Sequence, residues 1–373
     1  MNNTQNKNNI NKISCIELGT CSGKKIFWDP INHETNGHIL IPGQSGSGKS
    51  YCIQVIMKGL GLNGGRAIIL DLSGSLIKSQ GEKQFFSDLS NSLDYINAAK
   101  DGVVVDLFQR IKLDEETWEK DCDLAGRMVD TLSSFMRNGK SQNGYLYNCI
   151  MQVLRCSKET GDTPNLNILK AMLTNENGKL AQTILNKMNP LFDGNYFNGY
   201  PDCTFLGDDK PIKLVQMQSV PFGVKRMLTD ILLWSIWSLA VQTGLKENPL
   251  FIVIDEFQNA NLSASSPLYK ILCEGRKFNI NLILATQFIK GKFSSVIETA
   301  IDQVGNKIFF RPPDKEIKSI AYELAENALY LKQWEQQLKS LRKGEAIVKA
   351  DLCFDELGNS HFHQPLKVKI KGL

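Results

Sequence analysis

A glycine-rich stretch between two apolar segments constrains the fold of this chain more than any other feature. Residues 43–50 read GQSGSGKS, which fits the phosphate-loop pattern G-x-x-x-x-G-K-[ST]. An apolar run at 39–41 precedes the stretch, and a segment with helical hydrophobic spacing follows it. Glycines let successive backbone N–H groups turn toward a phosphate, and the N-terminus of the next helix adds partial positive charge. The stretch therefore predicts a strand, a phosphate-binding loop and a helix.

The residues of this loop have separate expected tasks. Lys49 is expected to bridge the β- and γ-phosphates of a nucleotide, and the Ser50 hydroxyl to ligate Mg²⁺. ATP and Mg²⁺ are therefore the expected cofactors. A chance glycine-serine turn is the alternative, but the flanking strand and helix patterns argue against it. The expected nucleotide contacts are Gly43, Gln44, Ser45, Gly46, Ser47, Gly48, Lys49, Ser50 and Tyr51.

An acidic pair ends a second apolar run, FIVIDEF at 251–257. A strand that ends in Asp places this carboxylate at the edge of the sheet where open α/β sheets bind ligands. Asp255 is expected to hold Mg²⁺ through water. Glu256 is expected to orient and deprotonate the water that attacks the γ-phosphate. Alone, the pair could be a solvated acidic turn, and the phosphate loop is what favours catalysis.

The remaining pattern is that of an α/β protein. Strand-like apolar runs lie at 65–74, 101–108, 210–217, 281–287 and 306–312. Helical segments separate several of these runs, so we expect a parallel-rich central sheet with helices on both faces.

The chain is expected to hold one ATPase domain with an insertion. Residues 1–11 are polar and rich in asparagine, which is typical of disorder. Residues 12–112 and 205–373 are assigned to the domain, and they include a short N-terminal β element. Residues 113–204, where the spacing is helical, form the insertion. The end of the chain resembles a β-hairpin with a turn near Gly358–Asn359.

Composition limits what the bulk properties of the chain can predict. The net charge of +4, from 43 basic and 39 acidic residues, is too small to predict nucleic-acid binding from bulk charge, so any such binding would need a local basic patch. Nine scattered cysteines and four histidines form no zinc pattern, and they fit reduced thiols in a cytoplasmic protein. The most apolar helical segment, 231–241, is far shorter than the roughly 20 residues of a membrane span. We therefore expect no membrane span.

A phosphate loop alone does not choose among kinases, GTPases, transporters and motors. The chain has no Asn-Lys-x-Asp motif for guanine recognition. The sequence LSGSL at 72–76 resembles a transporter signature, but it follows the phosphate loop too closely and is interpreted as a turn between strand and helix. A kinase would not need a glutamate directly after the Mg²⁺ aspartate.

The stretch CEGRKFNINLILATQ, at 273–287, narrows the class. The order of acidic pair, helix, basic turn and strand ending in Ala-Thr-Gln resembles the HerA–FtsK superfamily of DNA-pumping ATPases. The resemblance extends over about 30–110 and 205–373, and it implies a RecA-like P-loop NTPase core. Within the superfamily, the HerA-like ATPases of phosphorothioation-dependent DNA restriction (DptH) are the most similar group, and conjugation ATPases are the second.

The resemblance also implies roles for single residues. Gln287 would sense the γ-phosphate or hold the lytic water. Arg276 would enter a neighbouring subunit's site as an arginine finger, and Lys277 is the weaker candidate because an ammonium cannot form the bidentate fork. Arg311 is an alternative finger, and Asp71 could support the metal site.

The resulting hypothesis is a cytoplasmic, ring-forming ATPase, expected as a hexamer, that translocates or remodels DNA in anti-phage defence or DNA transfer. A nuclease or another defence effector is an expected partner. A nucleotide-switched scaffold with incidental ATPase activity is the alternative, and a P-loop kinase is the third possibility. The chain is expected to lack the N-terminal β-barrel of archaeal HerA and the winged helix of FtsK.

Overall fold

The computed structural model describes most of the chain. The described residues are 13–31, 36–77, 83–103, 105, 107–112, 116–136, 138–194, 196–197, 210–243, 249–289 and 293–373. The segment 1–11, predicted to be disordered, lies outside these residues.

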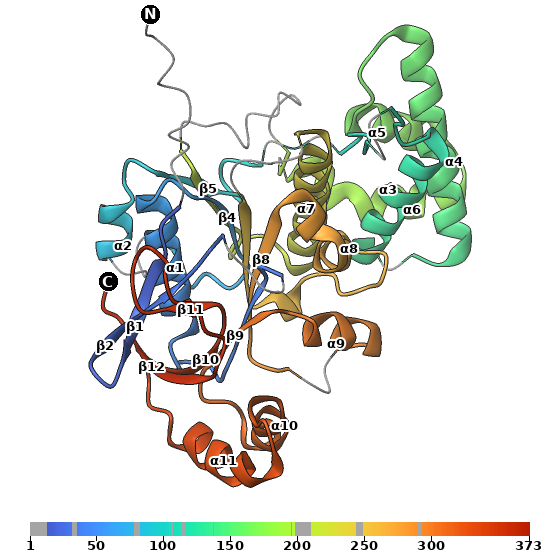
Figure 1. Cartoon of the computed structure of the whole chain (residues 1–373). Coiled ribbons are helices and arrows are strands. Elements are labelled where there is room, and N and C mark those ends of the chain that lie inside the picture. Colours follow the sequence, from blue (N-terminus) through green and yellow to red (C-terminus); the bar gives the residue numbers. More distant parts are fainter. Residues whose placement is uncertain are drawn as a thin grey trace, which may run out of the picture.

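One mixed sheet organises the described residues (Figure 1). Its twelve strands follow the order β11-β2-β1-β12-β10-β9-β3-β8-β7-β4-β6-β5. The half from β9 to β5 is parallel, which confirms the predicted parallel-rich α/β fold. Its strands are β9 (Asn306–Phe309), β3 (Ile39–Pro42), β8 (Ile280–Thr286), β7 (Leu250–Asp255), β4 (Arg66–Asp71), β6 (Ile212–Gln216) and β5 (Leu93–Asn97).

The other half of the sheet is antiparallel, and it joins the two ends of the described chain. The N-terminal β element pairs with the C-terminal hairpin, so β1 lies between β2 and β12. Ser22 and Gly23, both with positive φ, form the tight turn between β1 and β2. The strands are β1 (Ile16–Cys21), β2 (Lys24–Trp28), β10 (Glu345–Lys349), β11 (Leu352–Cys353) and β12 (Leu366–Ile370).

Helices cover both faces of the parallel half. Successive residues of a strand point to opposite faces of the sheet, and in these strands both sets of side chains are apolar and need covering. Ile252 and Ile254 of β7 pack toward one cluster of buried side chains, and Phe251 and Val253 pack toward the other. The cluster on the first face includes α7 (Phe222–Thr243), α8 (Pro267–Glu274) and α9 (Ser295–Asp302). It continues through α3 (Asp121–Met136), which packs on α7, to α4 (Lys140–Thr160), α5 (Leu166–Asn175) and α6 (Lys179–Asp193). The second carries α1 (Lys49–Leu62) and α2 (Lys83–Asp88).

A third cluster lies between the sheet and a pair of helices, α10 (Asp314–Leu324) and α11 (Leu331–Ser340). In Figure 1 these helices project from the antiparallel side, whereas α3 to α6 gather at the other end of the molecule. Three short 3-10 helices complete the described elements: η2 (Phe257–Asn259), η3 (Gly275–Phe278) and η4 (Ala328–Tyr330).

The apolar segment at 231–241 lies in the C-terminal half of α7, which is buried between the sheet and α3. This covering explains why the helix has apolar side chains on nearly every side. Among the helices that the structure describes, none combines the length and hydropathy that a membrane span requires.

Two sequence-based expectations about strands need correction. In the described part of the run at 101–108 there is no strand, and Val103 makes only an isolated bridge with Phe197. The edge strand is instead β5, whose alternating polar residues gave a weak apolar signal. The C-terminal hairpin is present as β10 and β12, but the chain between them leaves to pair β11 with β2.

Candidate functional site

The phosphate loop lies between β3 and α1, at the carboxyl edge of the parallel strands. Gly48 directly precedes α1 with a φ of 118°, a conformation that side chains rarely adopt. A Cβ atom at Gly43 would lie 2.5 Å from the Cβ of Phe310, which follows β9. Glycine is therefore required at both ends of the loop, once for backbone conformation and once for packing.

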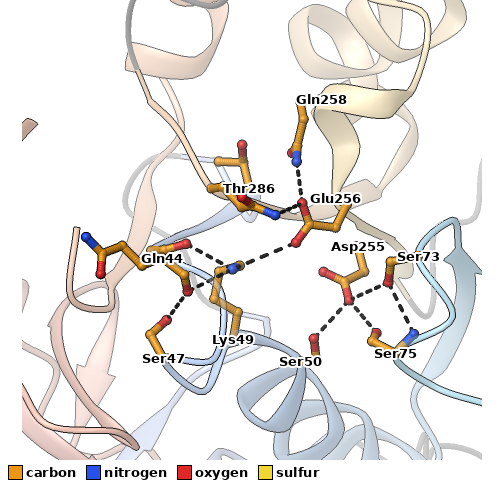
Figure 2. Close-up of polar contacts among 12 residues, drawn as sticks. Gln44, Ser47, Lys49, Ser50, Ser73, Ser75, Asp255, Glu256, Gln258 and Thr286 are labelled. Atoms are coloured by element: carbon orange, nitrogen blue, oxygen red, sulfur yellow. Dashed lines mark hydrogen bonds and ion pairs between the residues drawn. The ribbon is translucent and has the colours of Figure 1, made fainter. Parts of the chain in front are cut away.

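Lys49 is the first residue of α1, and its side chain is buried beneath the loop (Figure 2). Its ammonium donates to the carbonyl oxygens of Gly43 at 2.9 Å and Gln44 at 3.2 Å. Burial lowers the pKa of Lys49, and the carboxylates of Glu256 and Asp255 oppose that shift. Two backbone carbonyls and the nearby Glu256 carboxylate thus hold the lysine side chain at the point where the loop converges.

Asp255 ends β7 opposite the phosphate loop and accepts hydroxyl hydrogen bonds on one oxygen. Its Oδ2 accepts from Ser50 at 2.9 Å, Ser75 at 2.5 Å and Ser73 at 3.4 Å. Its Oδ1 is buried and has no hydrogen-bond partner among the described residues, which normally costs free energy of folding. The Asp255 carboxylate and the Ser50 hydroxyl fit a hard cation such as Mg²⁺, which takes one or two protein oxygens together with phosphates and waters.

Glu256 follows β7 in a left-handed conformation, with a φ of 58°. This conformation is uncommon outside glycine, and it directs the side chain back toward the loop. One oxygen, Oε1, lies 3.9 Å from the Lys49 ammonium. The other, Oε2, accepts from Gln287 at 3.0 Å and also from Gln258.

Asp71 is the neighbour of Asp255 across the β4–β7 pair, and it is fully buried. It organises the turn after β4 by accepting the backbone N–H groups of Gly74 at 2.8 Å and Leu76 at 3.0 Å. Burial raises the pKa of Asp71, and these hydrogen bonds oppose the shift. The turn that Asp71 shapes is the one that presents Ser73 and Ser75 to Asp255.

These groups surround a pocket of about 420 Å³. Sequence reasoning missed several of its lining residues: Ser73, Gly74, Ser75, Gln218 and Lys343. It also missed Gln258, which contacts Glu256. The serines had one signal, their place in a turn that directly follows a strand ending in Asp. Gln218 and Lys343 had none, because only the fold brings them to the loop.

The predicted basic residues lie in two different places. Arg276 is exposed in η3, at the start of β8, whereas Gln287 follows the end of the same strand. The guanidinium of Arg276 makes no hydrogen bond or ion pair with another residue in the described part of the chain. Lys277 pairs with Glu274 at 3.8 Å. Arg311 lies beside the chain's own phosphate loop, where its carbonyl accepts from the N–H of Gln44 at 2.9 Å.

Among the described residues, no group of three or more His, Cys, Asp or Glu side chains is placed to hold a metal ion. Trp28 of β2 packs edge-on against Phe251 of β7, with the ring centres 5.7 Å apart.

A parallel sheet with a glycine-rich phosphate loop and a facing Asp-Glu strand end defines a P-loop nucleoside triphosphatase. Residues 30–236 match the family described as "Helicase HerA, central domain", and the chain belongs to that family. It is an ATPase of the HerA–FtsK superfamily, as the sequence predicted. No curated protein matches the chain.

Solved structures share this fold. VirB4 of Thermoanaerobacter pseudethanolicus superposes with a TM-score of 0.73 at 17% identity, over 96% of this chain and 97% of that chain. The unbound bacterial conjugative coupling protein TrwB gives 0.63 at 15% identity, over 95% and 88%. Its complex with ADP and Mg²⁺ gives 0.61 at 14% identity, over 90% and 84%. At such identities the likeness establishes the architecture, including the RecA-like core.

Proposed function

We propose that this chain is a Mg²⁺-dependent ATPase that works as a ring, with six copies as the expected number, and moves or remodels DNA. The observation that carries the ring is the position of Arg276. It lies at the amino end of β8, while Gln287 and the phosphate loop lie at the carboxyl end. Seven residues of strand separate the two ends, a span of roughly 20 Å. Arg276 can therefore serve a nucleotide only in another copy.

This arrangement selects a particular kind of assembly. A chain with an acceptor site at one edge and a donor arginine at another must associate head to tail. Head-to-tail contacts close into a ring when the rotation between copies closes. Arg311 does not share this property, because it lies beside the phosphate loop of its own chain. We therefore assign the finger to Arg276.

Within one site, the proposed chemistry follows from the contacts. Lys49 leaves the carbonyls of Gly43 and Gln44 to bind the β- and γ-phosphates, and the loop's N–H groups hold the phosphate oxygens. Ser50 and Asp255 would hold Mg²⁺, which supplies charge neutralisation on the phosphates when bound. TrwB, with the same fold, has been solved with ADP and Mg²⁺ and with analogues of ATP and GTP.

Glu256 is the proposed general base. Its carboxylate takes a proton from water as the water oxygen bonds to the γ-phosphorus, and the bond from this phosphorus to the ADP oxygen breaks. Gln287 donates a hydrogen bond to Glu256 at 3.0 Å. Because it lies beside the proposed base, we propose that it orients the attacking water or senses the γ-phosphate. Arg276 of a second copy would stabilise the charge of the transition state.

The biological setting is proposed from the family. DNA is the proposed substrate of movement, in anti-phage defence or DNA transfer within the cytoplasm, with a nuclease or other effector as partner. VirB4 and the conjugative coupling protein TrwB share the fold, which is consistent with DNA transfer. We further propose residues 113–204 as a helical insertion into an ATPase domain of 12–112 and 205–373.

Mixing two inactive variants tests the shared site. Arg276→Ala and Glu256→Ala should each have little activity alone, and mixing them should restore part of the ATPase rate. In the mixture some interfaces combine an intact Glu256 with an intact Arg276. Lys277→Ala is the matched control, because it removes the neighbouring charge and should retain activity. If Arg276→Ala alone turns over normally and mixing rescues nothing, the finger assignment is wrong.

DNA stimulation tests the motor. A translocating ring should hydrolyse ATP at least several-fold faster with DNA present, and the Glu256→Ala variant should show no such rise. An ATPase rate that ignores every form of DNA would contradict translocation and favour the nucleotide-switched scaffold. Transfer of phosphate to a product, in place of free phosphate, would identify a kinase.

A further inference from the structure

A tight turn between α11 and β10 packs against the phosphate loop. The backbone N–H of Glu345 donates to the Arg342 carbonyl at 3.0 Å, and Gly344 has a positive φ of 79°. A positive φ at the third residue is the requirement of a type II turn, so Lys343 occupies the corner. The N–H of Gly344 donates to the Ser47 carbonyl at 3.1 Å, which fixes the turn on the loop itself.

The side chain of Glu345 holds this turn in shape. Its carboxylate accepts the backbone N–H of Arg342 at 2.9 Å and pairs with Lys367 of β12 at 2.9 Å. The hydrogen bond from Arg342 and the pairing with Lys367 lower the pKa of Glu345, so the carboxylate stays charged at neutral pH. The corner residue Lys343 is thus presented from a turn anchored on two sides.

Lys343 lines the nucleotide pocket from the side opposite the acidic pair. Its side chain is exposed and makes no hydrogen bond or ion pair with another described residue. A Cβ atom on Gly48 would lie 3.3 Å from the Gly344 nitrogen, so the turn reaches the loop where it enters α1. That end of a phosphate loop binds the α- and β-phosphates, whereas Asp255 and Glu256 face the γ-phosphate.

We propose that Lys343 is a second cationic contact to the nucleotide in the same chain, on its α- and β-phosphates. The inference rests on the proposed ATP site and adds a residue to it. Lys49 would supply a buried charge from beneath the phosphates, and Lys343 an exposed charge from the turn before β10. Since both ATP and ADP carry these phosphates, Lys343 contributes to binding of both nucleotides and little to the chemical step.

Nucleotide binding by the full chain tests this contact. Lys343→Ala should weaken binding of ADP and of a non-hydrolysable ATP analogue about tenfold each, the loss expected for one charge-assisted contact. The rate at saturating ATP should change little. Raising the salt concentration should narrow the gap between variant and wild type, because an exposed charge is screened. Arg342→Ala is the matched control, since it removes the same charge from the same turn but does not line the pocket.

Each outcome decides the inference. Wild-type affinity in Lys343→Ala, or an equal loss in Arg342→Ala, would overturn it. A loss confined to the ATP analogue would overturn the placement on the α- and β-phosphates. Lys343→Arg should keep most of the affinity, which would exclude a role in folding alone. Lys49→Ala tests the ATP site apart from the Lys343 contact, because unchanged nucleotide binding in that variant would refute the ATP site itself.

Discussion

At the scale of single residues, the site is built around two carboxylates with different surroundings. Asp255 accepts hydroxyls and keeps one buried oxygen without a partner, whereas Glu256 is held by amide groups beside Lys49. The first environment suits a metal ligand, and the second suits a base that must stay in place but exchange a proton. Under the proposed function, the neighbours of these two adjacent acidic residues thus give each one a different task.

Gln287 and Gln258 both donate to Glu256, so their variants separate two roles. Gln287 follows β8, the strand between β3 and β7, so it lies between the strands that carry the loop and the base. Gln287→Ala should lower kcat about 10²-fold, the scale of a lost orienting contact, without weakening binding of an ATP analogue. Gln258→Ala should lose less, because it contacts only the base. Equal losses in the two variants would mean that Gln287 does nothing beyond holding Glu256.

Asp230 of α7 makes stability depend on pH. The carboxyl group is buried and accepts from Asn261 at 2.7 Å on one oxygen, and its other oxygen has no hydrogen-bond partner in the described part of the chain. Burial raises its pKa from 3.8 to about 7, although Asn261 and Arg226 oppose the shift. The folded protein therefore holds a proton that the unfolded chain releases, and the free energy of unfolding falls as pH rises through this range.

Asp230→Asn should remove that part of the pH dependence. Between pH 4 and pH 8 the free energy of unfolding of the wild type should fall by a few kcal/mol relative to that of the variant, on the order of 1.4 kcal/mol for each unit of pKa shift. Urea unfolding of both proteins at several pH values measures the difference. Parallel pH profiles would show that Asp230 titrates normally.

At the scale of elements, the parallel strands were the most predictable part of the chain. The runs that became β3, β4, β7 and β8 are apolar because both sheet faces are covered, and each is followed by the polar residues of the site. The edge strand β5 could not be found in this way, since one of its neighbours is missing and its residues alternate. An apolar run at 101–108 gave the wrong position instead.

The parts of the site that the sequence did not reveal come from contacts between distant segments. Ser75 meets Asp255 across 180 positions, and Lys343 lies nearly 300 positions after the loop that it faces. Short polar residues in turns have no periodicity to reveal them. Lys49, Asp255 and Glu256 could be located because local backbone geometry, visible in the adjoining pattern, fixes where each one lies.

The η3 turn that carries Arg276 depends on a glycine. A Cβ atom at Gly275 would lie 2.9 Å from the carbonyl oxygen of Ile280 and 3.1 Å from Ile271. Phe278 at the other end of the turn packs edge-on against Trp237 of α7, with ring centres 4.9 Å apart. The turn is therefore wedged between β8 and α7, and it cannot shift without moving Arg276.

Gly275→Ala should destabilise the fold by about 1–3 kcal/mol through overpacking and should lower ATPase activity in the assembly. ADP binding should persist, since the phosphate loop lies at the other end of β8. Gly144→Ala in α4 is the control, because a Cβ there meets nothing within 4 Å and should stabilise the helix by about 0.4–1 kcal/mol. A Gly275→Ala protein with wild-type melting temperature and activity would contradict the packing argument.

At the scale of the whole molecule, the nucleotide pocket and Arg276 lie at opposite edges of the sheet. All residues that line the nucleotide pocket come from the carboxyl edge of the parallel strands and the turn before β10. Arg276 lies at the amino edge of the same sheet. Under the proposed function, one chain is therefore complete for binding nucleotide and incomplete for hydrolysing it.

Dilution should separate these two activities. Binding of ADP per chain should stay constant at every protein concentration, because one chain supplies the entire pocket. The ATPase rate per chain should fall as dilution dissociates the ring, and it should approach the rate of Arg276→Ala. Measuring rate and sedimentation on the same samples tests this coupling, with Lys277→Ala expected to follow wild type. A rate per chain that stays constant while the assembly dissociates would mean that each chain hydrolyses ATP alone, and Arg276 would then have no role in a neighbour's site.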